Sequence, residues 1–175
     1  MKRFFEKYSI ALSLLLVIGV MVMIFCFSAQ TGKESGAMSG KITTWVLKLV
    51  IPDFEEFSQD QQDTIRYAVG FMIRKLAHFS EYALLGFALM LHIAQIQKRI
   101  TVRVPWLWSW LIGTAYAASD EFHQSFVAER GPSVMDVLID SAGAICGILL
   151  ILWILHRVAK SSQNCYNTEK TYKGR

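Results

Sequence analysis

Ionisable side chains gather in three short stretches of this sequence, at spacings that would place them on shared helix faces. Residues three or four apart are neighbours on a helix surface, and this spacing recurs within 74–82, within 120–124 and between Asp136 and Asp140. Carboxylates beside histidines can act as general acids and bases, and basic side chains among them can bind phosphate. The candidate ligand-binding residues are Arg74, Lys75, His78, Glu81, Tyr82, Asp120, Glu121, His123, Gln124, Arg130, Asp136 and Asp140.

Two other interpretations of these residues stay open. The first is a divalent metal site, for which the candidate ligands are His78, Glu81, Asp120 and His123, although the chain has no HExxH motif. The second is structural, with the charges pairing to fix the register of neighbouring helices. Two histidines and at least five carboxylates are more than the pairing of three cations requires. No serine or cysteine stands in an evident nucleophile turn, so covalent catalysis through one of them is disfavoured.

The elements that must position these residues are membrane helices. Apolar residues make up 53% of the 175-residue chain and charged residues 18%, with a mean hydropathy of +0.34. This composition excludes a disordered chain and disfavours a soluble enzyme, because the apolar residues come in blocks of membrane-spanning length. We expect an all-α membrane protein with one domain over 1–160 and four transmembrane helices, at about 8–27, 71–96, 104–121 and 134–155. Close helix packing is predicted by the GxxxG spacing of Gly143 and Gly147.

A short interfacial helix is predicted in the long polar segment between the first two spans. Ile42, Trp45 and Leu49 recur at helical spacing there, and Pro52 marks a stop. An ordinary amphipathic helix that caps the bundle fits the same pattern. Further along, Ser58 and Gln61 form a capping box, so a long helix should begin there and continue into the second span.

The distribution of lysine and arginine predicts that both termini are cytoplasmic. The N-terminus, the segment 97–103 and the tail after His156 carry eleven basic residues against Glu6 and Glu169. The basic residues are Lys2, Arg3, Lys7, Lys98, Arg99, Arg103, Arg157, Lys160, Lys170, Lys173 and Arg175. Topology thus explains the net charge of +4, and we expect no nucleic-acid partner. Residues 161–175 would form a cytoplasmic tail, and the polar stretches would meet near the outer surface.

The remaining titratable residues of the apolar blocks have simpler interpretations. Cys26 and Cys146 lie inside these blocks and Cys165 in the tail, so no disulfide is expected. His92 stands alone, far from the polar stretches, and we interpret it as a hydrogen-bonded packing residue.

At these residues the sequence resembles the VanZ-like membrane proteins, the family of the teicoplanin-resistance protein VanZ, over about residues 8–156. The first block of the resemblance is Phe27-Ser28-Ala29-Gln30, followed by Gly32, Ser35 and Ser39. The second is Arg74-Lys75-Leu76-Ala77-His78-Phe79, followed by Glu81 and Tyr82. The third is Asp120-Glu121-Phe122-His123-Gln124, followed by Arg130, Asp136, Asp140, Gly143 and Gly147. The resemblance adds Ser28 and Gln30 to the candidate ligand-binding residues.

The resemblance implies a multi-pass protein of the bacterial cytoplasmic membrane, and some family members lower susceptibility to glycopeptide antibiotics. We expect an outer-leaflet polar pocket that binds a lipid-linked cell-wall intermediate, another membrane lipid or another membrane protein. The alternative is a metal-assisted hydrolase or transferase acting on a lipid-linked phosphate or peptide ester. Stoichiometric binding of a metal ion that is lost in His78→Ala would favour this alternative. The sequence alone leaves open whether the protein is an enzyme and whether it needs a cofactor.

Overall fold

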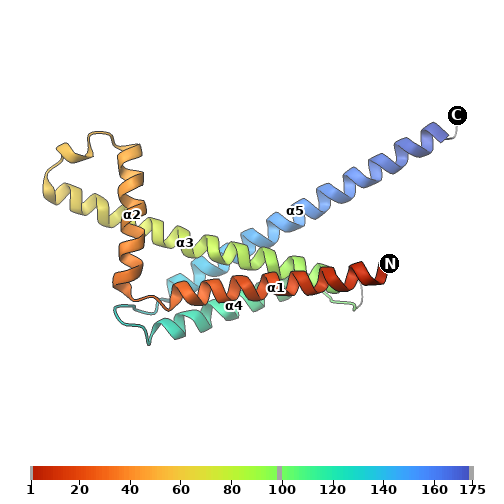
Figure 1. Cartoon of the computed structure of the whole chain (residues 1–175), viewed down its shortest axis with the longest axis horizontal. Helices are drawn as coiled ribbons and strands as arrows, with labels where there is room; N and C mark the ends of the chain where they lie inside the picture. Colours follow the sequence, from red (N-terminus) through yellow and green to blue (C-terminus); the bar gives the residue numbers. More distant parts are fainter. Residues whose placement is uncertain (1, 98–99, 174–175) are drawn as a thin grey trace.

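The computed structural model describes residues 2–97 and 100–173, with side chains outside 2–7, 162 and 164–173. Within those ranges every regular element is a helix, which confirms the all-α class (Figure 1). The elements are α1 (Lys2–Ser28), α2 (Gly32–Val50), the 3-10 turn η1 (Phe54–Glu56), α3 (Gln59–Ile96), α4 (Pro105–Gln124) and α5 (Val134–Lys173). Lys98, Arg99 and Arg175, three of the predicted cytoplasmic charges, lie outside the described residues.

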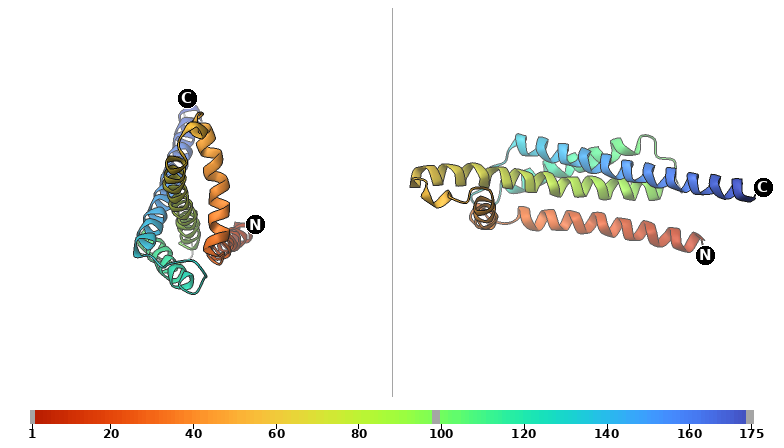
Figure 2. Two further views of the ribbon diagram at one scale, coloured as in Figure 1. Left: turned by 90° about the vertical axis from the view of Figure 1, so that its left-hand side faces the viewer. Right: turned by 90° about the horizontal axis from the view of Figure 1, so that it is seen from above.

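Helix α3 is the centre of the fold, because each of the other four α-helices packs against it (Figure 2). The contact with α5 is closest where glycines remove side chains from the interface. A Cβ atom added at Gly143 or Gly147 would collide with the backbone of Phe79 or Ala83 in α3. One added at Gly86 would likewise collide with the backbone of α5. The predicted GxxxG spacing therefore mediates helix packing within one chain.

Three helices are long and apolar enough to cross a membrane, namely Tyr8–Ser28, Gln59–Ile96 and Val134–Ser161. Much of their outer surface is apolar and exposed, whereas the buried core gathers on the inner faces of α1, α3 and α4. The predicted fourth span, 104–121, forms the 20-residue helix α4 but is not among the three candidates. Its tryptophans and its carboxylates Asp120 and Glu121 lower its hydropathy. The structure therefore supports three spans directly.

Helix α2 is longer than the hydrophobic pattern predicts, because it begins at Gly32, well before Ile42. A capping box starts it: Thr31 Oγ1 accepts a hydrogen bond from the Glu34 backbone N–H at 3.2 Å, and the Thr31 N–H donates to Glu34 Oε2 at 2.9 Å. The backbone and side-chain hydrogen bonds from Thr31 lower the pKa of Glu34. Helix α2 lies across the end of the other helices, with Trp45 exposed (Figure 1).

The second predicted capping box is confirmed, since Ser58 and Gln61 are hydrogen-bonded to each other at the start of α3. Helix α3 then runs unbroken through Gly70 for 38 residues. At about 1.5 Å per residue it is roughly 57 Å long, almost twice a bilayer core of about 30 Å. Helix α5 likewise continues beyond the predicted span, so the predicted tail is helical as far as Lys173.

The direction of the helices brings the three polar stretches together. The start of α1 and the end of α5 lie at one end of the bundle, while the α1–α2 corner and the connection between α4 and α5 lie at the other (Figure 1). His92 is hydrogen-bonded as predicted, with its Nδ1 2.9 Å from Ser13 Oγ of α1. Cys26 and Cys146 are free thiols.

Candidate functional site

Three polar side chains on one face of α3 line the same cavity. Arg74, His78 and Glu81 are four and three residues apart, so they follow one side of the helix. All three line a cavity of about 110 Å³. Tyr82 turns inward instead: it is completely buried, and its ring centroid lies 6.3 Å from that of Tyr116 in α4. The predicted shared face is thus confirmed for Arg74, His78 and Glu81, with Tyr82 behind it.

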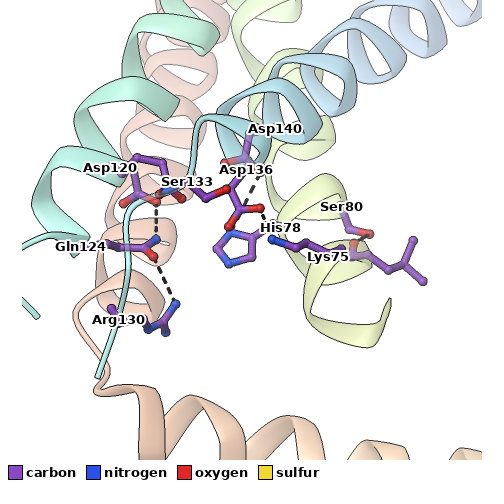
Figure 3. Close-up of polar contacts among 11 residues, drawn as sticks. Lys75, His78, Ser80, Asp120, Gln124, Arg130, Ser133, Asp136 and Asp140 are labelled. Atoms are coloured by element: carbon purple, nitrogen blue, oxygen red, sulfur yellow. Dashed lines mark hydrogen bonds and ion pairs between the residues drawn. The ribbon is translucent and has the colours of Figure 1, made fainter. Parts of the chain in front are cut away.

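Arg130 joins the connection between α4 and α5 to the end of α1. Its Nε donates to the backbone oxygen of Gln30 at 3.2 Å and its Nη2 to that of Phe27 at 3.3 Å. Its Nη1 donates to Gln124 Oε1 at 3.4 Å, and Gln124 Nε2 donates in turn to Asp120 Oδ2 at 3.2 Å. Figure 3 shows this chain of contacts from Arg130 to Asp120. The end of α4 and the end of α1 are therefore held on either side of one guanidinium group.

Glu121 and His123 support this corner from outside the cavity. Glu121 Oε2 accepts a hydrogen bond of 2.8 Å from the backbone N–H of Ser133, the residue just before α5. The His123 ring stacks on Phe25 of α1, with ring centroids 4.8 Å apart. Neither residue lines the two cavities of the site. Their predicted part in ligand binding stays a prediction.

Helix α5 presents two carboxylates to α3, each opposite a basic residue. Asp136 forms an ion pair with Lys75 through its Oδ1. One turn later, Asp140 is completely buried, and its Oδ1 lies 4.0 Å from His78 Nδ1. Gly143 and Gly147, further along α5, let the two helices pack closely. This close packing holds the carboxylates of α5 next to the basic residues of α3.

A second cavity, of about 350 Å³, adjoins the first and shares Ser35, Arg74, His78 and Arg130 as lining. One wall of the smaller cavity is apolar and is formed by Ile24, Phe27, Met38, Ile42, Ile73 and Ala77. Ten of the predicted residues line one cavity or the other, namely Ser28, Gln30, Arg74, Lys75, His78, Glu81, Asp120, Gln124, Arg130 and Asp136. The convergence that the sequence predicted is thus confirmed as geometry.

The three basic side chains of the site are held in different ways. Lys75 is paired with Asp136. Arg74 has no hydrogen bond or ion pair with any other described residue, although it lines both cavities. Arg130 donates only to neutral oxygens within the described part of the chain. Neither guanidinium group forms an ion pair with a carboxylate of the described residues, although Glu81 and Asp120 line the smaller cavity with them.

Helix α2 forms a wall of the smaller cavity that the sequence did not predict. Ser35, Ser39, Met38 and Ile42 all line the smaller cavity. Ser35 and Ser39 belong to the block that carries the family resemblance, yet their chemistry alone did not mark them as ligand-binding residues. The capping box at Thr31 was the sequence signal that could have extended α2 back to Gly32 and so placed these serines.

Several buried polar atoms in and around the cavity walls have no hydrogen-bond partner among the described residues. They are Ser28 Oγ, His78 Nδ1, Tyr82 OH, Glu121 Oε1, His123 Nε2 and both carboxylate oxygens of Asp140. Buried polar atoms usually have hydrogen-bond partners, so these atoms could bind water or a ligand in the cavities. Within the described side chains, no three histidines, cysteines or carboxylates lie close enough to share a metal ion.

Comparison with known proteins agrees with the sequence blocks and with this arrangement. No curated protein and no solved structure matches the chain. The VanZ/LLP1 family model matches residues 13–156, which include α2 to α4, most of α1 and the part of α5 that packs against α3. Because the match covers most of the sequence and all the residues of both cavities, the chain belongs to the VanZ/LLP1 family.

Proposed function

We propose that this protein binds the phosphate or pyrophosphate group of a lipid-linked cell-wall intermediate. The observation that carries the proposal is a cavity lined by Arg74 and Arg130, whose guanidinium groups have no carboxylate partner among the described residues. Arginine matches phosphate oxygens in charge and in bidentate geometry. Arg74 lies within the second predicted span, where a cation is costly unless an anion accompanies it, so an anionic ligand suits this side chain.

The wall of the smaller cavity favours a lipid over a free phosphate. Its apolar lining, with Ile24 and Phe27 from α1 and Ile73 from α3, adjoins the polar lining directly. An amphiphile with an anionic head group would place the head group at Arg74 and Arg130 and the start of its chain against these apolar side chains. Basic pockets between membrane helices bind lipid head groups in this way.

The proposed placement in the bacterial cytoplasmic membrane has four spans, both termini in the cytoplasm and the cavities near the outer surface. Helix α4 supplies the fourth span, since its 20 residues measure about 30 Å and match the thickness of a bilayer core. The excess of lysine and arginine at the end of the bundle that carries the termini supports the orientation. A ligand in this position is a cell-wall precursor in the outer leaflet, and sequestering it would lower susceptibility to glycopeptide antibiotics.

Binding of a long-chain polyprenyl phosphate to the full-length protein in detergent micelles tests the proposal. We expect Arg74→Gln to weaken binding by about 10- to 100-fold, since a hydrogen bond to a charged group contributes about 1.5–3 kcal/mol. The matched control is Arg157→Gln, because Arg157 lies over the Trp153 ring near the middle of α5 and lines neither cavity. It should bind as the wild type does.

Two further measurements make the test decisive. The corresponding polyprenyl alcohol, which lacks the phosphate, should bind weakly to the wild type and equally weakly to Arg74→Gln. Cells that produce the wild type should tolerate more teicoplanin than cells that produce Arg74→Gln at the same level. Equal affinity of the wild type and Arg74→Gln for the phosphate would overturn the proposal.

A further inference from the structure

We propose that the site also cleaves its ligand: His78 attacks the terminal phosphate of a lipid diphosphate and releases inorganic phosphate by way of a phosphohistidine. This inference rests on the proposed function, because Arg74 and Arg130 must first hold the phosphate. It adds an activity that needs neither a metal ion nor a serine or cysteine nucleophile. The evidence is the position of one histidine between a cavity and a buried carboxylate.

His78 presents different edges of its ring to its two sides. The residue lines both cavities, yet its Nδ1 is fully buried and lies 4.0 Å from Asp140 Oδ1 (Figure 3). Nε2 is therefore the ring nitrogen available to a ligand. Among the described residues, His78 Nδ1 and both oxygens of Asp140 form no hydrogen bond. The carboxyl group of Asp140 therefore faces the buried edge of the ring.

Asp140 acts as a positioning residue for this nucleophile. A carboxylate next to Nδ1 keeps the proton on that nitrogen, so the lone pair of Nε2 points to the cavity. The same carboxylate stabilises the positive charge that the ring gains when Nε2 forms a bond. A separation of 4.0 Å is longer than a hydrogen bond, and such contacts commonly shorten when the substrate binds.

The other groups that this reaction needs come from the same lining. Arg74 stands one turn before His78 on α3, and Arg130 faces the cavity from the α4–α5 connection. Together their guanidinium groups would hold the non-bridging oxygens of the phosphate beside Nε2. Catalysis of phosphoryl transfer consists largely of such positioning and charge stabilisation.

The reaction balances with water as its second substrate. Nε2 forms a bond to the terminal phosphorus while the bond from that phosphorus to the bridging oxygen breaks, and the electron pair leaves with the lipid monophosphate. Water then attacks the phosphorus, the phosphorus–nitrogen bond breaks, and its electron pair returns to Nε2. The products of the second step are inorganic phosphate and one proton. A diphosphate suits this site better than a monophosphate, because its leaving group is a phosphate anion that departs without a proton donor.

The experiment uses the full-length protein in detergent micelles with a polyprenyl diphosphate that carries ³²P in the terminal phosphate, in the presence of EDTA. We expect release of labelled phosphate and, on rapid quenching, a protein label that is stable to base and labile to acid. His78→Gln should abolish both signals, while its circular dichroism spectrum in detergent stays that of the wild type. The matched control His92→Gln should keep both signals, because His92 bonds to Ser13 far from the cavities.

Asp140→Asn separates positioning from structure. We expect kcat to fall by at least about tenfold with little change in KM, since the ring keeps its place but loses the charge that stabilises the phosphorylated state. Equal kcat values for Asp140→Asn and the wild type would overturn the role of Asp140.

The outcomes distinguish this inference from the proposed function. Binding of the diphosphate by the wild type without phosphate release would overturn the inference and leave the proposed function intact. Phosphate release by His78→Gln at the wild-type rate would overturn it as well. Failure of the wild type to bind either polyprenyl phosphate would overturn both proposals.

Discussion

The site contains three positively charged side chains, Lys75, Arg74 and Arg130. They differ in the groups that they contact. Lys75 meets Asp136 and so links α3 to the first turn of α5. Three of the five N–H donors of Arg130 are directed to backbone and amide oxygens, which are neutral and leave its charge unpaired. Arg74 has no bonded partner in the described part of the chain. These surroundings support a structural role for Lys75 and are consistent with the proposed ligand-binding role of the two arginines.

The ion pair between Lys75 and Asp136 should contribute measurably to stability. Both side chains are mostly buried, with 24% and 15% of their surfaces exposed. We expect Lys75→Met to lower the free energy of unfolding by about 1–3 kcal/mol, because Asp136 keeps its charge in a poorly solvated place. Unfolding in detergent, followed by circular dichroism, measures this change.

The matched test for this pair is a double-mutant cycle with Asp136→Asn. Lys75→Met and Asp136→Asn combined should cost less than the sum of the single changes, since the second substitution removes the charge that the first leaves unpaired. Strictly additive effects would show that the contact contributes nothing to the fold.

At the scale of the helices, local sequence signals predicted some ends and missed others. Ser58 and Gln61 precede an apolar periodic stretch, so the start of α3 could be read directly. Thr31 and Glu34 form the same motif, but the residues from Ser35 to Gly40 are small except for Met38 and give no apolar stripe. The serines of α2 become a cavity wall only when α2 packs against α3, and no local pattern contains that information.

The connection between α4 and α5 shows a second limit of sequence spacing. Its backbone meets the start of α2, where the Gly32 N–H donates to the Ala128 oxygen at 3.0 Å. A Cβ atom at Gly32 would collide with the backbone of Glu129, which itself has a φ of 60°. Residues far apart in the sequence thus fix this corner together, and hydrophobic periodicity says nothing about such a contact.

A glycine-to-alanine substitution should have opposite effects at Gly147, in the contact between α3 and α5, and at Gly19 in α1. Gly147→Ala should destabilise the protein by about 1–3 kcal/mol, because the added methyl group meets the backbone of Ala83 rather than a movable side chain. Gly19→Ala in α1 is the control: nothing lies within 4 Å of its Cβ position, so the higher helix propensity of alanine should leave stability equal or slightly higher. Detergent unfolding of both variants measures the difference, and equal stability would contradict the close packing.

At the scale of the whole molecule, alternation of helix direction determines where the site forms. Because α1, α3, α4 and α5 run back and forth along the bundle, the end of α1, the end of α4 and the start of α5 meet at one end, beside the polar turns of α3 (Figure 1). This arrangement could be predicted from four apolar blocks alone. The division of the polar residues between cavity wall and supporting layer could not, since it depends on side-chain packing among four helices.

The arrangement makes a prediction about which face of the membrane the cavities adjoin. In a chain whose native cysteines are replaced, Asp60→Cys marks the start of α3 on the cavity side, and Ser161→Cys marks α5 on the side of the termini; both positions are exposed. We expect a membrane-impermeant maleimide to label Asp60→Cys in intact cells and Ser161→Cys only after the membrane is broken, because the basic residues keep the termini inside. A permeant maleimide should label both variants and controls for reactivity. Labelling of Ser161→Cys alone in intact cells would place the cavities in the cytoplasm, where they would meet precursors before export rather than after it, and the proposed link to glycopeptide susceptibility would be lost.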